Sequence, residues 1–272
     1  MLTLPQLVAH ALAEDIGPGD VTTQATIDPH ARGKARVYAK QPLVVCGQGA
    51  AAEVFAQCGA TWEAALPDGA WATPGQDVGH ATGPLAALVT AERCALNFLM
   101  RLSGIATHVR DCVEGIDGID VLDTRKTTPL HRALEKHAVR CGGARNHRFG
   151  LFDGVMIKDN HIVAAGGIGV AVARARAHAH ALLRVEVEVE TLEELHEAIE
   201  SGADVVLLDN MDDATLREAV AINAGRARLE ASGNMTAERL RRLVGIGIDQ
   251  VSMGGLIHQA RWADLSMRVA AR

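Results

Sequence analysis

From about residue 118 onward, short apolar stretches alternate with longer amphipathic ones. Short apolar runs rich in β-branched residues are typical of buried strands, and amphipathic stretches between them are typical of helices that cover a parallel sheet. The six apolar runs are IDVLD (119–123), VMIKD (155–159), VEVEV (185–189), DVVLLD (204–209), RLEAS (228–232) and DQVSM (249–253). The predicted helices include PLHRALEKHAVRCGG, TLEELHEAIESG and TAERLRRLVGIG, the last two with a capping Thr at the start and a Gly at the end. This order predicts an α/β fold, a β/α barrel.

The first hundred residues follow a different pattern. A helix is predicted from Pro5 to Glu14 and a strand in GKARVYAK, and Gly- and Pro-rich turns follow around PDGAWATPGQDVG. A long helix from about Leu85 to Leu102 is expected to lead into the barrel. The sequence therefore predicts an N-terminal α+β domain over 1–103 and a barrel domain over 104–272, with the N-terminal helix or the C-terminal tail able to pack across domains.

Polar side chains gather where the predicted strands end. Barrel enzymes place their chemistry at the carboxyl ends of the strands, so these positions predict an active site. They are Arg125 and Lys126, then Lys158, Asp159 and His161, then Glu188, then Asp209 and Asn210, then Ser232 and Gly233, and finally Gly254 and Gly255. Any one of them is compatible with a solvated loop, but a structural barrel has no reason to gather all of them on one rim.

The segment 123–161 carries eight Lys and Arg against four Asp and Glu, in a chain whose formal net charge is -6. Such a local positive field attracts small anions and holds them through charge-assisted hydrogen bonds. Arginine suits carboxylates because its planar fork is bidentate, and lysine suits phosphates as a mobile point charge. His147 and Arg148 also fit an exposed basic loop, and Lys158 with Asp159 also fits a structural ion pair.

Two carboxylates, Glu188 and Asp209, end consecutive predicted strands. Together they suit a magnesium ion, held directly or through its waters. The alternative is that the glutamates of VEVEVE point to the outside of a strand, which alternation alone does not decide. The glycine turns at the last two strand ends resemble a phosphate cradle of backbone amides, although glycine turns are common.

Composition narrows the class of protein. The negative net charge and 3% aromatic content argue against a nucleic-acid surface, which usually has a basic face and stacking rings. No uncharged apolar run reaches the ~18 residues of a membrane span, and no secretory leader pattern is present, so a cytoplasmic protein is expected. The five scattered cysteines indicate neither a disulfide framework nor a zinc site, and they are expected to be buried thiols.

Several ordered motifs resemble the quinolinate phosphoribosyltransferase family, the decarboxylating enzymes of NAD biosynthesis. They are LAEDIGPGDVTT, ERCALNFLMRLSGIAT, DTRKTTP, EKHAVRCGGARNHRFGL, IKDNH, VEVEVET, LLDNM, EASGNM and VSMGGLIH. The resemblance covers nearly the whole chain, and the IKDNH motif distinguishes it from a molybdate-associated relative. It implies an open-faced sandwich and an incomplete barrel, a magnesium requirement, and homodimers or higher oligomers in which one subunit covers its partner's site.

The resemblance also implies roles for single residues. Those expected to bind quinolinate are Arg125, His147, Arg148 and Lys158, with Arg93 reaching in from the partner subunit. Those expected to bind phosphoribosyl pyrophosphate are Thr124, Lys126, Glu188, Asp209, Ser232, Gly233, Asn234, Met253, Gly254, Gly255 and His258. Catalytic roles fall to Lys126, Lys158, Glu188 and Asp209, and the last two are expected to hold magnesium, through water.

Three positions depart from the family pattern, namely Leu130, His131 and Ala144, where TTPGLR and GGGxNHR are usual. Leucine adopts a positive φ only at a cost, so we expect the turn at Leu130 to differ. Two rival functions stay open: a barrel lyase that uses Lys158 as a Schiff-base nucleophile, and a non-catalytic sensor of an anionic metabolite.

Overall fold

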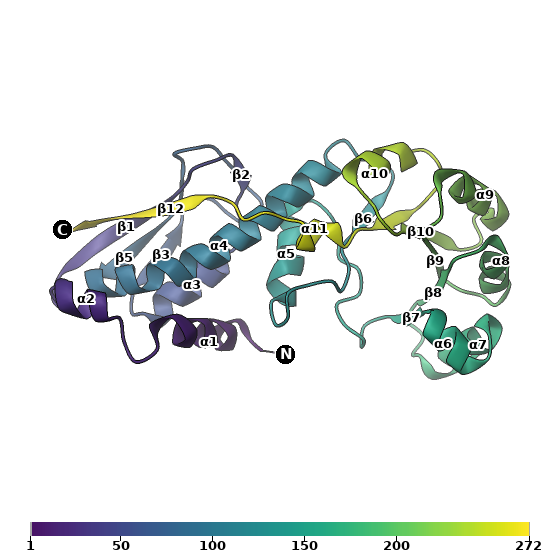
Figure 1. Cartoon of the computed structure of the whole chain (residues 1–272), viewed down its shortest axis with the longest axis horizontal. Helices are drawn as coiled ribbons and strands as arrows, with labels where there is room; N and C mark the ends of the chain where they lie inside the picture. The colour runs from purple at the N-terminus through teal and green to yellow at the C-terminus, as the bar shows by residue number, and fades with distance from the viewer. Residues whose placement is uncertain (1, 272) are drawn as a thin grey trace. The chain divides into compact units, whose positions relative to one another are not determined.

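The structure of the protein is a computed structural model that describes residues 2–271, and the chain in it divides into two compact units (Figure 1). The first unit contains the residues up to Arg110, Thr127–Gly143 and those from Gln259 onward. The second contains Asp111–Lys126 and Ala144–His258. The predicted domain boundary after residue 103 falls inside helix α4 (Leu85–Val113), which is longer than the helix expected from the sequence.

The first unit is built on a four-stranded antiparallel sheet with the order β12-β1-β5-β3. Its strands are β1 (Arg32–Ala39), β3 (Thr61–Ala64), β5 (Asp77–Pro84) and β12 (Leu265–Ala271), and a separate pair is formed by β2 (Leu43–Val44) and β4 (Trp71–Ala72). Its helices are α1 (Leu4–Ile16), α2 (Val21–Thr26), α3 (Gln48–Gln57), α4 and α5 (Arg132–Gly142). Strand β12 therefore brings the chain back to β1 after the barrel has been traversed.

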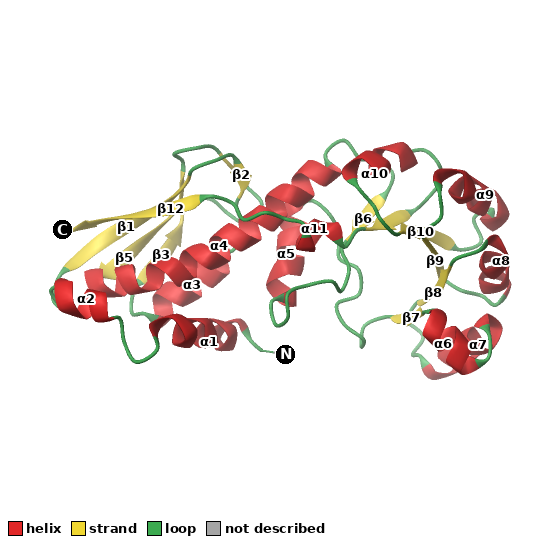
Figure 2. Cartoon of the chain, viewed as in Figure 1, coloured by secondary structure: helices red, strands yellow, loops and turns green. Residues whose placement is uncertain are grey.

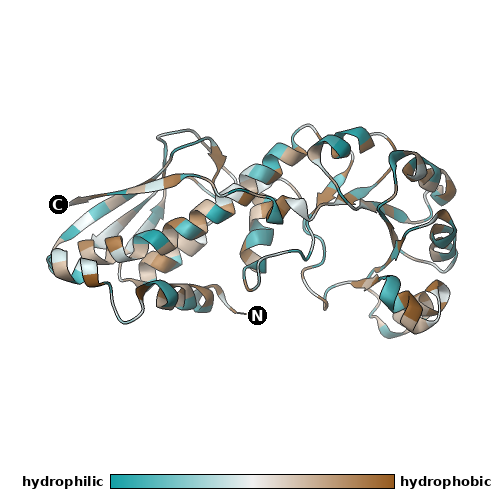
Figure 3. Cartoon of the chain, viewed as in Figure 1, coloured by the Kyte–Doolittle hydropathy of each residue, from teal (hydrophilic) through white to brown (hydrophobic). Residues whose placement is uncertain are grey.

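One face of this sheet carries the core of the first unit. Along β1 the burial alternates, so that Ala35 and Val37 are buried and Lys34 and Arg36 are exposed. The inner face belongs to one apolar cluster with α1, α3 and α4, to which Phe55 and other buried side chains contribute. In Figure 3 hydrophobic and hydrophilic residues alternate along α4, as expected of a helix with one buried side. This arrangement is the open-faced sandwich that the family resemblance implies.

The second unit is an incomplete barrel of six parallel strands in the order β6-β11-β10-β9-β8-β7 (Figure 2). The strands are β6 (Asp120–Leu122), β7 (Val155–Ile157), β8 (Val185–Val189), β9 (Val205–Asp209), β10 (Arg228–Ser232) and β11 (Gln250–Ser252). The helices are α6 (Asp159–Ala165), α7 (Ile168–His178), α8 (Leu192–Glu200), α9 (Asp213–Asn223), α10 (Ala237–Leu243) and α11 (Gly255–His258). The α/β fold and all six predicted strands are confirmed within one to two residues.

Local sequence signals fix the helices of the barrel. The hydroxyls of Thr191 and Thr236 accept hydrogen bonds from the backbone N–H groups of Glu194 and Arg239, which are the predicted caps of α8 and α10. Apolar side chains on these helices, such as Leu195, are buried against the sheet. Within residues 2–271, no helix is long and apolar enough to span a bilayer.

One expectation about the turns is wrong. Leu130 adopts a φ of 67°, the left-handed conformation that favours glycine, so the turn before α5 does not change to avoid it. The side chain is 72% exposed, so little packing offsets the strain. A left-handed non-glycine residue costs about 1–2 kcal/mol.

Candidate active site

The carboxyl ends of the barrel strands surround a cavity of about 450 Å³. Its lining includes nine residues that the sequence predicts for the site: Thr124, Arg125, Lys126, His147, Arg148, Lys158, Glu188, Asp209 and Ser232. The other lining residues are Met156, Leu207, Glu230 and Ser252. The rim predicted from the strand ends is thus one shared cavity inside the second unit.

Strand alternation explains how β8 and β9 deliver two acids to this cavity. Val187 and Leu208 are fully buried under the outer helices, whereas Glu188 and Asp209 line the cavity. This settles which face of VEVEVE is the lumen, because Glu186 also points inward. The alternative that these glutamates face outward is wrong for Glu186 and Glu188, and only Glu190, beyond the strand, is exposed.

Lys158 and Glu188 form an ion pair across neighbouring strands. The parallel register pairs Ile157 with Val187, so the residues that follow stand side by side. A Schiff-base nucleophile attacks its carbonyl substrate through the nitrogen lone pair, whereas the Nζ atom of Lys158 is engaged by Glu188. This pairing therefore disfavours the lyase reading.

Positive charge is concentrated around Arg148. Burial lowers the pKa of its guanidinium, and the charge of Arg125 lowers this pKa further. The side chain is held by a hydrogen bond of 3.1 Å from Nη1 to the carbonyl of Gly154. Two guanidinium groups close enough to repel each other favour anion binding, because a bound anion offsets their mutual repulsion.

A buried acid positions the loop that carries these groups. Asp123 is fully buried, and its carboxylate accepts hydrogen bonds from the backbone N–H of His147 (2.9 Å) and the side-chain amide of Asn146 (2.7 Å). Arg145 forms a parallel bridge with Leu122 of β6. Asp123 therefore acts on the site through the backbone, and its position after an apolar strand is the signal that points to it.

The ring of His147 is fixed at both nitrogens. The backbone N–H of Arg148 donates to Nδ1 at 2.7 Å, and Nε2 lies 3.1 Å from Glu186. Because Nδ1 accepts, the proton belongs on Nε2, which donates to the carboxylate. His147 thus lies beside the cavity with its polar atoms already engaged by the protein.

Two inward glutamates were not predicted from the sequence. Glu186 and Glu230 lie on either side of Nε2 of His147, at 3.1 and 3.7 Å. Burial, and after it the charge of Glu186, raise the pKa of Glu230 to about 7. Among the described residues, no hydrogen-bond partner lies within reach of the Oε1 atom of either glutamate. Each glutamate lies two residues before a predicted site residue on the same strand, Glu186 before Glu188 and Glu230 before Ser232. Residues two apart on a strand share a face, and this spacing was the signal that could have identified them.

The glycine turns bring further predicted residues to the rim. A Cβ atom on Gly254 would lie 2.9 Å from Lys126, 3.3 Å from His258 and 3.4 Å from Thr124, so these residues form one cluster. Gly233 has a φ of 92°, and a Cβ there would lie 2.2 Å from the side chain of Asn210. The remaining predicted residues lie beside these turns: Asn234 contacts Asn210, Met253 is buried, and Gly255 begins α11.

Arg93 is the one predicted site residue outside this unit. It is exposed on α4, in the first unit. Its expected role in a partner's site stays a prediction.

A second cavity, of about 490 Å³, lies toward the amino ends of the strands. Three of its charged residues are paired with one another, since Asp120 accepts from Arg145 at 2.6 Å and from Arg228 at 3.5 Å. In barrel enzymes this end of the strands serves stability. The smaller cavity at the carboxyl ends is therefore the candidate active site.

Comparison with known proteins agrees with this choice. A family model described as the C-terminal domain of quinolinate phosphoribosyl transferase matches residues 105–268, and the N-terminal domain model matches residues 20–103. The chain is 42% identical over 272 residues to a probable nicotinate-nucleotide pyrophosphorylase (carboxylating) of Bacillus subtilis, covering 98% of this chain and 94% of the relative. A Synechocystis protein of the same description is 43% identical over 265 residues, covering 95% and 90%. The crystal structure of NadC from Streptococcus pyogenes superimposes with a TM-score of 0.94 at 41% identity, over 100% of this chain and 99% of that one.

Proposed function

The chain belongs to the quinolinate phosphoribosyltransferase family, and we propose that it transfers a phosphoribosyl group from phosphoribosyl pyrophosphate to quinolinate. The reaction releases carbon dioxide and pyrophosphate and yields nicotinate mononucleotide, a step of NAD biosynthesis. The observation that carries the proposal is the single cavity where Arg125, Lys126, Arg148 and Lys158 meet Glu188 and Asp209.

Quinolinate is a pyridine with two neighbouring carboxylates. Arg125 and Arg148 are the groups in the cavity best suited to them, because each guanidinium can form a bidentate pair with a carboxylate. His147 contributes by holding the backbone of the Arg148 loop, since its ring nitrogens are engaged by Arg148 and Glu186. Lys158 adds positive charge next to Glu188. Together these contacts would orient quinolinate so that its ring nitrogen faces the ribose of the second substrate.

Phosphoribosyl pyrophosphate takes the opposite side of the rim in this proposal. Lys126 and His258 approach Gly254 closely, and no Cβ fills the space there, so phosphate oxygens can reach backbone amides and Lys126. Ser232 lines the same cavity, and Gly233 follows it. The positive charge of Lys126 would stabilise the pyrophosphate as it departs.

The acids Glu188 and Asp209 fit a magnesium ion. Two carboxylates on neighbouring strands at a polar cavity offer the few oxygen ligands that magnesium takes from a protein while it keeps waters and substrate phosphates. When bound, the ion would neutralise charge that builds on the leaving pyrophosphate. Glu188 also forms an ion pair with Lys158, which places that lysine beside the proposed metal position.

The chemistry then needs no protein nucleophile. The ring nitrogen of quinolinate attacks the anomeric carbon as the bond to pyrophosphate breaks, through a transition state with oxocarbenium character. Holding the two substrates in a fixed relative orientation can lower the activation free energy by ~7 kcal/mol or more. The quaternary nitrogen then stabilises the electron pair left on the neighbouring carbon when carbon dioxide departs, and that carbon takes up a proton.

Two further parts of the proposal concern assembly and location. We propose homodimers or higher oligomers in which Arg93 completes the partner's quinolinate site, supported by its exposure on α4. We also propose a cytoplasmic enzyme without nucleic-acid or membrane partners, supported by the composition and net charge of the chain.

One assay tests the function. The purified protein is mixed with quinolinate, phosphoribosyl pyrophosphate and magnesium, and release of pyrophosphate and carbon dioxide is followed. Both products should appear in equal amounts, only with both substrates, and should stop when magnesium is chelated. A protein that binds quinolinate but releases neither product would be a sensor, and borohydride trapping of a carbonyl substrate on Lys158 would indicate a lyase.

A further inference from the structure

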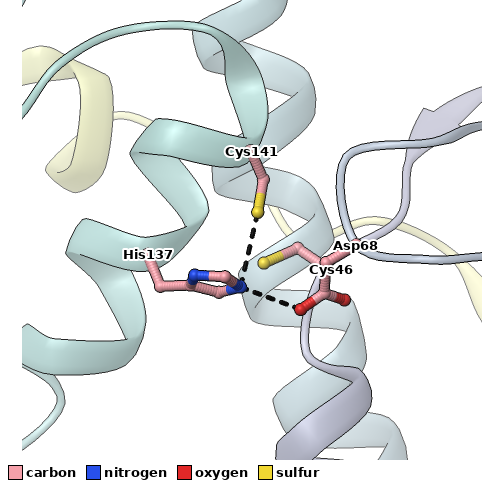
Figure 4. A group of neighbouring side chains, drawn as sticks. All are labelled: Cys46, Asp68, His137 and Cys141. Atoms are coloured by element: carbon pink, nitrogen blue, oxygen red, sulfur yellow. Dashed lines mark hydrogen bonds and ion pairs between the residues drawn. The ribbon is translucent and has the colours of Figure 1, made fainter.

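Outside the active site, four potential metal ligands from three segments of the first unit lie together (Figure 4). Cys46 lies in the loop between β2 and α3, Asp68 lies in the turn between β3 and β4, and His137 and Cys141 lie on α5. One ligand atom from each, Sγ, a carboxylate oxygen, a ring nitrogen and Sγ, lies within 4.8 Å of all the others.

The two loops that carry Cys46 and Asp68 are fixed to each other by the backbone. Val45 donates to the carbonyl of Ala70 and Gly69 donates to the carbonyl of Val45, each at 2.8 Å. The Oδ1 atom of Asp68 accepts from the first N–H groups of α3, those of Gly47 and Gln48. These bonds leave its Oδ2 atom directed at His137, 2.8 Å away.

The backbone of Cys46 is held from the other side by α4. Its N–H donates to the hydroxyl of Ser103 at 2.9 Å, and that hydroxyl lies 3.1 Å from the carbonyl of Cys46. The thiol is buried. The backbone that carries this thiol is therefore held in place by the fold.

The other two side chains share one face of α5, since residues four apart stack on a helix. The Nε2 atom of His137 lies 3.4 Å from Sγ of Cys141. The end of α5 is tied down by Arg110, whose guanidinium donates to the carbonyls of Cys141 and Gly142. All four ligands thus come from backbone segments that the fold already holds.

We propose that Cys46, Asp68, His137 and Cys141 bind a zinc ion. Tetrahedral zinc with bonds of about 2.0 Å to nitrogen or oxygen and about 2.3 Å to sulfur separates its N and S ligands by roughly 3.5 Å and its N and O ligands by roughly 3.3 Å. The corresponding separations here are 3.4 Å and 2.8 Å. Both separations are therefore close to those of a tetrahedral zinc, and the His137–Asp68 pair has to open by roughly 0.5 Å to reach the ideal value.

The donor set selects zinc over the magnesium of the active site. Two thiolates and an imidazole are ligands for zinc, whereas magnesium takes oxygen. The place of Cys141 in the last turn of α5 also favours a cation over a bare reactive thiolate, because the carbonyls at the end of a helix carry negative charge. His137 and Asp68 are partly exposed, at 39% and 21% of their side chains, which leaves the metal a route in.

Four protein ligands close the coordination sphere, which is the pattern of a structural rather than a catalytic zinc. Such an ion would link the loop after β2, the turn before β4 and α5 inside one unit. Sequence spacing did not indicate this site because its ligands are scattered over the chain and include a single i, i+4 pair.

The test is metal binding by the full-length protein after chelation and reduction. Cobalt is added as a spectroscopic substitute for zinc, and thiolate-to-cobalt absorption and tetrahedral ligand-field bands are recorded. One equivalent should bind with the spectrum of two thiolates, excess magnesium should not displace it, and one equivalent of zinc should. X-ray absorption on the zinc-loaded wild type should then show two sulfur and two lighter neighbours.

Variants assign the site. Cys141→Ser should remove about half of the thiolate absorption, and Cys46→Ser should do the same. Cys58→Ser is the matched control, because Cys58 is a free, partly exposed cysteine of the same unit outside the cluster, and its spectrum should be unchanged. The proposal is overturned if the reduced wild type binds no stoichiometric cobalt, if Cys141→Ser leaves the spectrum intact, or if the metal has only oxygen and nitrogen neighbours.

Discussion

The Nε2 atom of His147 lies 3.1 Å from a carboxylate oxygen of Glu186, and both side chains are almost completely buried. With Nδ1 accepting from the backbone of Arg148, Glu186 is the acceptor for the ring proton. Glu186→Leu would remove the nearest acceptor of this buried donor, at a cost of about 1–3 kcal/mol in the free energy of unfolding. Glu186→Gln keeps an acceptor and should cost less. Urea unfolding of both variants measures the difference, and equal stability would contradict the proton assignment.

Arg148 should determine selection of the diacid. Arg148→Ala removes one carboxylate partner and should raise the KM for quinolinate about 30-fold, the equivalent of about 2 kcal/mol. The KM for phosphoribosyl pyrophosphate should change little. Arg145→Ala is the control, since Arg145 pairs with Asp120 away from this cavity. Steady-state kinetics with each substrate varied decide the matter, and wild-type values for Arg148→Ala would contradict the carboxylate assignment.

Glu230 should make stability depend on pH. Burial, then the charge of Glu186, raises its pKa from 4.5 to about 7 in the folded state, so between these values the folded protein binds more protons than the unfolded chain. The contribution of Glu230 to stability is therefore full below about pH 4.5 and is lost as the pH rises through about 7. Glu230→Gln should reduce the fall in unfolding free energy between pH 5 and pH 8.

The measurement is urea unfolding at these two pH values. Glu238→Gln is the control, because Glu238 is an exposed carboxylate and its removal should leave the pH dependence of the wild type. An equal fall in Glu230→Gln and wild type would show that the carboxyl group titrates at its ordinary value.

Gly254 should be required for the position of Lys126. In Gly254→Ala the new Cβ would lie 2.9 Å from the Lys126 side chain, which must move. We expect a rise of about tenfold or more in the KM for phosphoribosyl pyrophosphate, since small misplacements are costly in such sites. Gly49→Ala, whose new Cβ would meet only Leu4 at 3.9 Å, should behave as wild type. Unchanged kinetics in Gly254→Ala would argue against a phosphate site there.

Leu130→Gly should stabilise the protein. Relief of the left-handed strain exceeds the entropy that glycine loses on folding, for a net gain of about 0.5–1 kcal/mol. Leu182→Gly is the matched control, because Leu182 is 90% exposed but is not among the positive-φ residues, and it should not stabilise. Thermal unfolding compares the two, and destabilisation by Leu130→Gly would show that the leucine side chain contributes more than its strain.

The barrel and its rim could be predicted from the sequence because both depend on local patterns. Apolar runs define strands, and parallel strands bring their carboxyl ends to one edge, so Lys158, Glu188 and Asp209 had to meet. The contribution of Glu186 and Glu230 depends on which strand face is the lumen. Alternation does not fix that face until the helices are placed.

Other features arise from long-range placement and leave no local signal. Cys46, Asp68 and Cys141 come together only because two loops and α5 meet in the first unit. The left-handed Leu130 was missed for the opposite reason, since a local preference predicted a different turn and tertiary structure imposed the strained one. The backbone conformational preference of one residue contributes only about 1 kcal/mol to the free energy of folding, and the packing of a whole helix contributes more.

The register of β1 with β12, from Gly33 opposite Ala271 to Ala39 opposite Leu265, orders events during synthesis. A ribosome makes β1 early but makes β12 only after every strand of the barrel. Until β12 has been made, the edge of β1 that it will cover stays unpaired. Such an edge is prone to aggregate, and non-local pairing of this kind is slow. The barrel, whose residues emerge together, is therefore free to fold first, and closure of the sandwich sheet comes as the late step.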